Sequence, residues 1–312
     1  MRRWPQAVAA SPAGGAQSHD GNPARSLRPR TALLGAYDGG RGVVLSRLAG
    51  VAAVIASLAT APALAQEPLR LFAAGSLREA MNEIAVAYGR ETGRQVAASF
   101  GFSGVMRERI EHGEAADLFA SADTGHPQRL LRDGRASRVV LFARNALCLV
   151  APSGTGLSDR TAVQFLLDHS VPLGVFPPVQ DPVGDYTLEL FRRLEAEHPG
   201  AEAALRARTT VITEALLDRP LSAGEDLAVA LLQDGRIRLH VSYCTTARIR
   251  LTAAVPGLEI AALPAALAIG PAYGLAVLRD SRAGAEDLAL FILGEVGQRT
   301  LARFGFTPVT LP

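Results

Sequence analysis

The sequence predicts an α/β protein with a mainly parallel sheet, and two observations support this fold class. From residue 66 onward, short apolar runs alternate with segments of helical periodicity, which is the pattern of strands followed by helices. The chain is also long enough for one large or two medium domains, since it has 312 residues, of which 48% are apolar and 20% are charged.

The predicted elements follow one another along the chain. The strands cover residues 69–73, 95–100, 117–121, 146–151, 172–176, 208–212, 237–243, 258–263 and 272–278. The helices cover residues 77–92, 104–112, 126–133, 160–168, 185–197, 214–218, 225–234 and 285–303. In such sheets a ligand binds outside the carboxyl ends of the strands, where the following helices begin. The strand-to-helix turns are therefore the places to search for a site.

The N-terminal part of the chain reads as a leader. Residues 1–42 are rich in Gly, Pro, Ser and Arg without apolar periodicity, so we expect them to be disordered or to lie upstream of the true start. Residues 43–65 are predicted to be a signal peptide, because the uncharged run from residue 48 ends in Ala63-Leu64-Ala65. The alternative is a transmembrane anchor, but this run is rich in Ala and is interrupted by Pro62.

Composition argues against a nucleic-acid partner and against one kind of phosphate-binding site. The net charge is +2, all 32 basic residues are arginine, and no Arg-rich block with interleaved aromatic residues occurs. We therefore expect no nucleic-acid partner. A phosphate-binding P-loop is excluded because its lysine is missing.

The chain has two cysteines, Cys148 and Cys244. Both lie in predicted strands and could pair, but the sequence does not show whether their Cα atoms are close enough. Two buried free thiols are the favoured interpretation. Because no Cys-x-x-Cys or His-x-x-x-His spacing occurs, we expect no metal site.

The first two turns each place a serine beside glycine. Ser76 precedes Glu79 by three residues, the spacing of a capping box, so we expect the first helix to begin at Ser76. Its buried face is predicted to contain Leu77, Ala80, Met81, Ile84 and Tyr88. In the second turn, Gly101 and Gly104 flank Ser103 and would let the backbone approach a ligand closely.

The third turn begins a helix at Asp181, which precedes Pro182 and so gives the usual cap followed by a proline. The N–H groups of Val183 and Gly184 are then expected to be free. Helix starts carry free N–H groups and a partial positive charge, so an anion can bind there without a cationic side chain.

The fourth turn has Ser222 three residues before Glu225, followed by a helix through Leu227 and a strand that ends at Tyr243. The phenolic O–H at the end of that strand can donate to a ligand. Each turn taken alone could be a capped helix start without a ligand. Four such turns together favour an anion site.

Seven segments of the chain resemble the molybdate-binding protein family of ABC transporters, which are type II periplasmic substrate-binding proteins. They are, in the family's order, FAAGSL, ADLFASAD, NALCLVAP, PVGDY, VSYCTTA, YGLAVL and FGFTPV, spread over residues 69–310. The resemblance implies two Rossmann-like α/β lobes joined by two crossover strands. Lobe 1 would consist of residues 66–146 and 272–312, and lobe 2 of residues 147–271.

The resemblance also implies a ligand, a site and a partner. The ligand would be molybdate or tungstate, captured in the periplasm by a monomer and delivered to an inner-membrane ABC permease with its ATPase. No cofactor and no catalysis are implied. The residues that would contact the oxyanion oxygens, without ligating the metal itself, are Ser76, Ser103, Val183, Leu227 and Tyr243.

Two basic residues near these turns are expected to play no part. Helical periodicity turns Arg78 and Arg107 away from the first-turn N–H groups, and Glu111 lies four residues after Arg107 as a surface partner. Sulfate or another small oxyanion is the alternative ligand. Protonated phosphate is disfavoured because it needs an acceptor, and none of the five matched positions carries a carboxylate.

A serine hydrolase is the alternative function. The sequence Gly101-Phe102-Ser103-Gly104 is similar to a nucleophile elbow, but Val105 stands where that pattern needs glycine. The nearest bases in the sequence are His112 and His126, and no orienting acid is evident. We therefore expect a binding protein rather than an enzyme.

Overall fold

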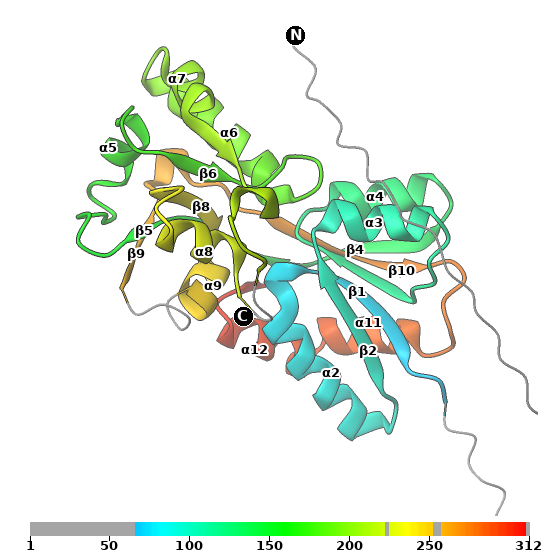
Figure 1. Ribbon diagram of the computed structural model, residues 1–312. Helices are drawn as coiled ribbons and strands as arrows, with labels where there is room; N and C mark the ends of the chain where they lie inside the picture. Colours follow the sequence, from blue (N-terminus) through cyan, green and yellow to red (C-terminus); the bar gives the residue numbers. More distant parts are fainter. Residues whose placement is uncertain (1–65, 222–224, 252–256, 310–312) are drawn as a thin grey trace, which may run out of the picture. The chain divides into compact units, whose positions relative to one another are not determined.

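The chain forms two mixed β-sheets rather than one mainly parallel sheet, as the computed structural model shows (Figure 1). The structure describes residues 66–221, 225–251 and 257–309, all within one compact unit. The predicted disordered segment and signal peptide lie outside the described residues. Within the described part, no helix is both long and apolar enough to cross a membrane.

The first sheet has the strand order β11-β4-β10-β3-β1-β2. Its strands are β1 (Leu69–Ala74), β2 (Val96–Gly101), β3 (Leu118–Ser121), β4 (Ala136–Arg144), β10 (Ala272–Leu278) and β11 (Thr307–Pro308). β1 pairs with β2 and β3 in parallel, whereas β10 and β11 pair with their neighbours antiparallel. Strand β4 was not predicted, because two register shifts against β10 interrupt its alternation of buried and exposed residues.

The second sheet has the strand order β7-β6-β8-β5-β9. Its strands are β5 (Leu147–Pro152), β6 (Leu173–Val175), β7 (Thr209–Val211), β8 (Leu239–Tyr243) and β9 (Leu258–Ala262). β6 is parallel to β7 and β8, while β5 runs antiparallel between β8 and β9. Each sheet thus contains a parallel trio of strands whose carboxyl ends meet at one edge.

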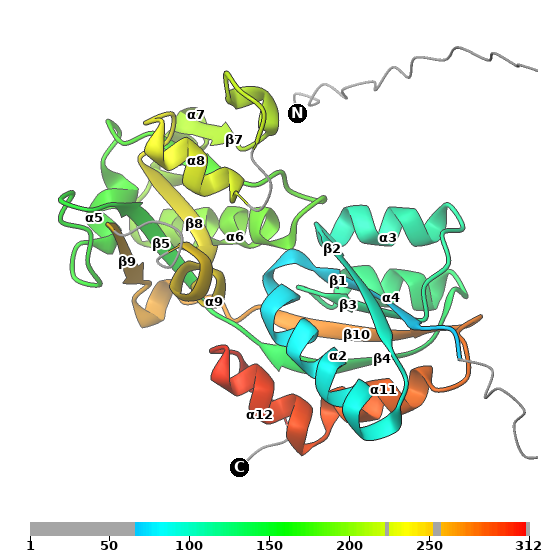
Figure 2. The same cartoon turned by 60° about the horizontal axis from the view of Figure 1, so that its bottom comes forward.

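Helices connect these strands (Figure 2). Those of the first sheet are α2 (Arg78–Thr92), α3 (Ser103–Glu111), α4 (Gly125–Arg132), α11 (Ala285–Leu293) and α12 (Glu295–Arg303). Those of the second are α5 (Ala162–Leu167), α6 (Pro182–Glu197), α7 (Ala201–Arg208), α8 (Leu227–Gln233) and α9 (Cys244–Thr246). The short turns are η1 (Gly75–Leu77), η2 (Glu214–Leu216), the π-helical η3 (Ala247–Leu251) and η4 (Ala265–Leu267).

Three α-helical segments differ from the prediction. The helix expected over residues 285–303 is broken at Gly294, whose extended backbone separates α11 from α12. Helix α7 was not predicted, because it follows α6 after a gap of only three residues and the two read as one polar stretch. The third is α9, which was not predicted and which directly follows Tyr243 at the end of β8.

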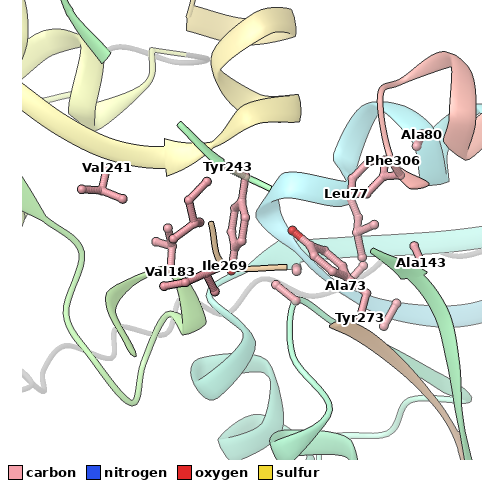
Figure 3. Packing of buried hydrophobic residues seen from close by; sticks show 14 of the residues in the cluster. Ala73, Leu77, Ala80, Ala143, Val183, Val241, Tyr243, Ile269, Tyr273 and Phe306 are labelled. Atoms are coloured by element: carbon pink, nitrogen blue, oxygen red, sulfur yellow. The ribbon is translucent and has the colours of Figure 1, made fainter. Parts of the chain in front are cut away.

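The chain passes between the sheets at residues 145–146 and again at residues 263–271. Aromatic side chains pack where the sheets meet, and Figure 3 shows Tyr243 of β8 beside Tyr273 of β10. Their ring centroids are 5.7 Å apart in an edge-on arrangement, and Tyr273 packs in turn against Phe142 and Phe306. One hydrophobic cluster therefore extends through both sheets.

The two cysteines form a disulfide, so the prediction of free thiols was wrong. Cys148 and Cys244 are 96 residues apart in sequence, with Cα atoms 4.9 Å apart. Antiparallel pairing of β5 with β8 places Leu147 opposite Tyr243, and the Cys244 N–H donates to the Ala146 carbonyl at 2.8 Å. The pairing of strands, which the sequence does not state, brings the two thiols together.

Candidate functional site

A cavity of about 210 Å³ lies where the carboxyl ends of the parallel strands of both sheets meet. Its walls include Ala74, Gly101 and Ala122, at the ends of β1, β2 and β3. From the second sheet come Phe176, just after β6, and Tyr243, the last residue of β8. This is the position that the topology of the sheets favours for a ligand.

Four of the five predicted contact residues line this cavity: Ser76, Ser103, Val183 and Tyr243. The fifth, Leu227, is not part of the lining, but it directly follows Asp226, which is. The structure therefore brings together residues that lie up to 167 positions apart in the sequence (243 minus 76). What each can donate depends on its other hydrogen bonds.

Ser76 does not cap a helix. It lies inside the short turn η1, α2 begins two residues later, and no side chain caps either start. The Ser76 hydroxyl instead shares a hydrogen bond of 3.0 Å with the Tyr273 hydroxyl. The capping-box prediction was wrong because the chain makes a tight 3₁₀ turn before the helix, which moves the serine away from the first N–H groups of α2.

Tyr273 and Asn145 support Ser76, and neither was predicted as a site residue from the sequence. Asn145 lies between the sheets, and its side-chain N–H donates to Tyr273 Oη at 3.0 Å. Because Tyr273 Oη accepts there, its own proton can go to Ser76 Oγ, which leaves the Ser76 proton for a ligand. The only signal in the sequence was the presence of both residues in the segments that resemble the family.

Ser103 is the first residue of α3 and is 1% exposed. Its Oγ accepts the N–H of Ala122 at 3.1 Å, from the turn after β3. A hydroxyl that accepts in this way still has its proton to donate. Ser103 is thus fixed as a donor.

Tyr243 is the most distinctive group in the cavity. It is 4% exposed, and its hydroxyl oxygen is fully buried without a hydrogen-bond partner among the described residues. Burial raises the pKa of the Tyr243 hydroxyl well above its usual value, so the group keeps its proton. A buried phenol with a free proton, facing a cavity, is suited to an acceptor supplied by a ligand.

Helix α6 begins as predicted, with Asp181 as its cap and Pro182 as its first residue. However, the N–H groups of the next two residues are not free. The Asp181 carboxylate accepts the Val183 N–H at 3.1 Å, and the Asp181 carbonyl accepts the Gly184 N–H at 2.9 Å. A ligand must compete with the Asp181 side chain for the Val183 N–H.

Asp181 also brings an acidic group into the cavity. Burial, together with the nearby charges of Asp185 and Asp123, raises the pKa of the Asp181 carboxyl to about 7. At neutral pH this side chain is close to its midpoint, so it can donate a proton or accept one. None of the five matched positions carries a carboxylate, as the sequence showed, but Asp181 lies outside those five and lines the cavity, which weakens the argument against phosphate.

Helix α8 begins at Leu227 with Asp226 as its cap, and the predicted cap Ser222 lies outside the described residues. The Asp226 side chain accepts the N–H groups of Ala228 at 2.9 Å and Val229 at 3.2 Å. The Leu227 N–H has no acceptor in the described part of the chain. It is the one predicted backbone donor that is available.

Arg78 was expected to point away, yet it lines the cavity, with its guanidinium 4.8 Å from the Phe100 ring centroid. The short turn η1 rotates the start of α2, which changes the direction of this side chain. Arg107 does bond to Glu111 as predicted, but it is buried rather than on the surface. A positive charge therefore lies beside the candidate hydroxyl donors.

The two lobes touch beside the cavity. The Gly104 N–H at the start of α3 donates to the Gln180 carbonyl before α6 at 2.8 Å. A Cβ atom on Gly104 would lie 2.2 Å from the carbonyl oxygen of Val179. Only glycine allows this close approach. The contact holds the two lobes together, as a ligand bound between them would require.

Among the described residues, Ser103 has no histidine partner of the kind that a serine hydrolase needs. Ser103 Oγ bonds to the Ala122 N–H, while Nδ1 of His126 accepts from Arg107 Nε at 3.1 Å. Burial lowers the pKa of His126, although the nearby carboxylate of Asp123 acts in the opposite direction, and the hydrogen bond that the His126 ring accepts comes from a cation. Across the described ranges, no cluster of three His, Cys, Asp or Glu side chains could hold a metal ion.

Comparison with known proteins agrees with this geometry. A family model described as bacterial extracellular solute-binding protein matches residues 69–307. This chain belongs to that family.

The relatives of this chain include two proteins that are named molybdate-binding proteins. Over 178 residues the chain is 33% identical to an uncharacterized protein of Pasteurella multocida, covering 57% of this chain and 74% of that protein. Over 143 residues it is 35% identical to the molybdate-binding protein ModA of Escherichia coli, covering 43% of this chain and 55% of that protein. The chain thus matches about half the length of the latter.

Solved structures share the two-lobed fold. The periplasmic molybdate-binding protein of Azotobacter vinelandii superposes with a TM-score of 0.62 at 21% identity, over 78% of this chain and 99% of that chain. The sulfate-binding protein SubI of Mycobacterium tuberculosis gives a TM-score of 0.64 at 18% identity, over 78% and 87%. The predicted type II periplasmic binding protein fold is confirmed.

Proposed function

We propose that this solute-binding protein captures molybdate or tungstate in the cavity between its lobes and delivers the oxyanion to an ABC permease with its ATPase. Delivery of this kind takes place in the periplasm, where the predicted signal peptide would send the chain. The observation that carries the proposal is the buried hydroxyl of Tyr243, which has no hydrogen-bond partner in the described part of the chain, while Tyr243 lines the same cavity as Ser76 and Ser103.

The donors of the cavity suit a dianion. Molybdate and tungstate offer only acceptor oxygens, and Ser76, Ser103 and Tyr243 each have a proton to give. Arg78 adds a positive charge, and the Leu227 N–H adds a backbone donor. A hydrogen bond to a charged group contributes about 1.5–3 kcal/mol, so five donors give about 7.5–15 kcal/mol before costs. Micromolar to nanomolar affinity corresponds to about 8–12 kcal/mol, so only the upper part of this range leaves a surplus for desolvation, closure and lost motion.

The division of donors between the lobes couples binding to closure. Ser76, Ser103 and Arg78 lie in turns and helices that follow strands of the first sheet. Tyr243 ends a strand of the second sheet, and Leu227 begins the helix that precedes that strand. An oxyanion reaches all five only when the lobes meet, so it stabilises the closed arrangement. The closed arrangement is the form that a permease would recognise.

A protonated oxyanion such as hydrogen phosphate is the second candidate ligand. Asp181 favours it, because a carboxylate in the cavity can accept the ligand's proton. For molybdate, by contrast, Asp181 has to be neutral or to move away. Hydrogen phosphate would therefore need Asp181 in its charged form, whereas molybdate would need it neutral or out of contact.

Thermal-shift and calorimetric titrations of the full chain separate these candidates. Molybdate, tungstate, sulfate and phosphate are added singly, and we expect molybdate and tungstate to raise the melting temperature most, as a ligand of the native state must. The Asp181→Asn variant is the control, because it should retain molybdate binding and weaken phosphate binding, since a neutral amide oxygen is a weaker acceptor than a carboxylate. No shift with molybdate or tungstate at millimolar concentration would refute the proposal.

A further inference from the structure

A second buried hydroxyl in the cavity has no partner. The Thr246 Oγ1 atom, like the Tyr243 hydroxyl, is inaccessible to solvent and has no hydrogen bond among the residues that the structure describes. Both residues line the cavity, and Thr246 lies three positions after Tyr243 at the end of the short helix α9. In the described ranges these are the two hydroxyls among five buried side-chain polar atoms without a partner.

The neighbouring threonine, Thr245, shows that a hydroxyl in this segment can find a hydrogen-bond partner within the protein. Thr245 is also buried, but its Oγ1 accepts the side-chain N–H of Asn145 at 2.9 Å. The Thr245 hydroxyl therefore has a partner within the protein, whereas the hydroxyl of Thr246, which lines the cavity, has none among the described residues. Burying an unpaired hydroxyl is unfavourable, so such a group is expected to have a partner outside the described chain.

We propose that Thr246 is a further ligand contact, which donates its hydroxyl proton to the bound oxyanion beside Tyr243. This inference rests on the proposed function, since it takes the occupant of the cavity to be an oxyanion. It adds a side-chain donor that neither the sequence patterns nor the resemblance assigned. A tetrahedral anion has four acceptor oxygens, so hydroxyls from one segment can serve two of them.

The fold holds this segment in place at three successive residues. Tyr243 is paired with Leu147 across the sheet, Cys244 is joined to Cys148 by the disulfide, and Thr245 is bonded to Asn145. Residues 145–148 thus form a rigid support on which the donors of residues 243 and 246 are presented. A donor fixed before the ligand arrives loses little conformational freedom on binding.

The test compares Thr246→Val with Thr246→Ser in the full chain, titrated with molybdate and tungstate by calorimetry. Valine keeps the shape and removes the hydroxyl, so we expect the dissociation constant to rise about 10- to 100-fold. Serine keeps the hydroxyl, so binding should stay within about threefold of the wild type. The matched control is Thr209→Val, at the edge of the second sheet, where the hydroxyl donates to the Leu205 carbonyl at 2.7 Å. Its affinity should equal that of the wild type.

Melting of the ligand-free proteins distinguishes a ligand contact from a structural role. Thr246→Val should melt no lower than the wild type, because it removes a buried hydroxyl that has no partner. Should Thr246→Val fail to fold, Thr246→Ala in the same titration takes its place, with the same expected loss. Wild-type affinity in Thr246→Val or Thr246→Ala would overturn the inference and leave the proposed function standing. If the wild type bound neither oxyanion, the proposed function would fall, and the inference with it.

Discussion

Replacing Tyr243 by phenylalanine should have two effects of opposite sign. The ring is 4% exposed and packs against Tyr273 with centroids 5.7 Å apart, and phenylalanine keeps that packing. The hydroxyl has no partner among the described residues, so its removal relieves a buried polar group that costs about 1–3 kcal/mol. For a folded unit of this size, 1 kcal/mol corresponds to about 2–4 °C in melting temperature. The ligand-free variant should therefore melt about 2 °C or more above the wild type.

Binding should change in the other direction. Tyr243→Phe loses one hydrogen bond to a charged acceptor, about 1.5–3 kcal/mol, which weakens molybdate binding about 10- to 150-fold. Calorimetric melting without ligand and isothermal titration with molybdate measure the two effects separately. Tyr88→Phe is the control. Tyr88 lies on helix α2, outside the cavity lining, and its hydroxyl donates to the Gly284 carbonyl at 3.4 Å. It should lower or leave unchanged the melting temperature and leave the affinity intact.

A Tyr243→Phe variant that melts lower than the wild type and binds molybdate equally well would refute this reasoning. Such a result would mean that the hydroxyl has a structural partner and no ligand. The placement of the site around the end of β8 would then be wrong.

Three further predictions concern the contact between the lobes, the disulfide and the acidic group. Gly104→Ala should weaken molybdate binding about tenfold or more in titrations, because the new methyl group would lie 2.2 Å from the Val179 carbonyl oxygen and keep the lobes apart. Replacing Cys148 and Cys244 together by alanine should lower the free energy of unfolding in urea by about 2–5 kcal/mol, because the disulfide closes a long loop, with a sequence separation of 96. Molybdate affinity should fall as pH rises above about 7, by at most about tenfold per pH unit. The reason is that a dianion prefers Asp181 neutral and takes up a proton on binding, and Asp181→Asn should remove this dependence.

Each of these has a clear contrary outcome. Unchanged affinity in Gly104→Ala would show that the lobes do not need this contact. Equal unfolding midpoints with and without the disulfide would show that the strands hold lobe 2 by themselves. Affinity that is constant from pH 6 to pH 9 would show that the Asp181 carboxylate lies away from the bound anion.

The sequence by itself determined the local elements and the turns that matter. Alternating apolar runs and helical faces located nearly all strands and helices, because these patterns depend on residues two to four positions apart. The Asp181-Pro182 start of α6 was also predicted correctly, since a helix cap involves only adjacent residues. The order of the turns in the chain indicated that Ser76, Ser103 and Tyr243 would lie at one edge.

Only the tertiary structure decided what each of these groups bonds to. Ser76 bonds to Tyr273, 197 residues away, and not to the start of its own helix. Cys148 pairs with Cys244 because β5 lies beside β8, and the same pairing holds the start of α9, whose last residue, Thr246, lines the cavity. Periodicity along a chain states which residues are buried, but not which strands are neighbours. Contacts between distant segments form only when the whole core packs, and the donors of this cavity are set by those contacts.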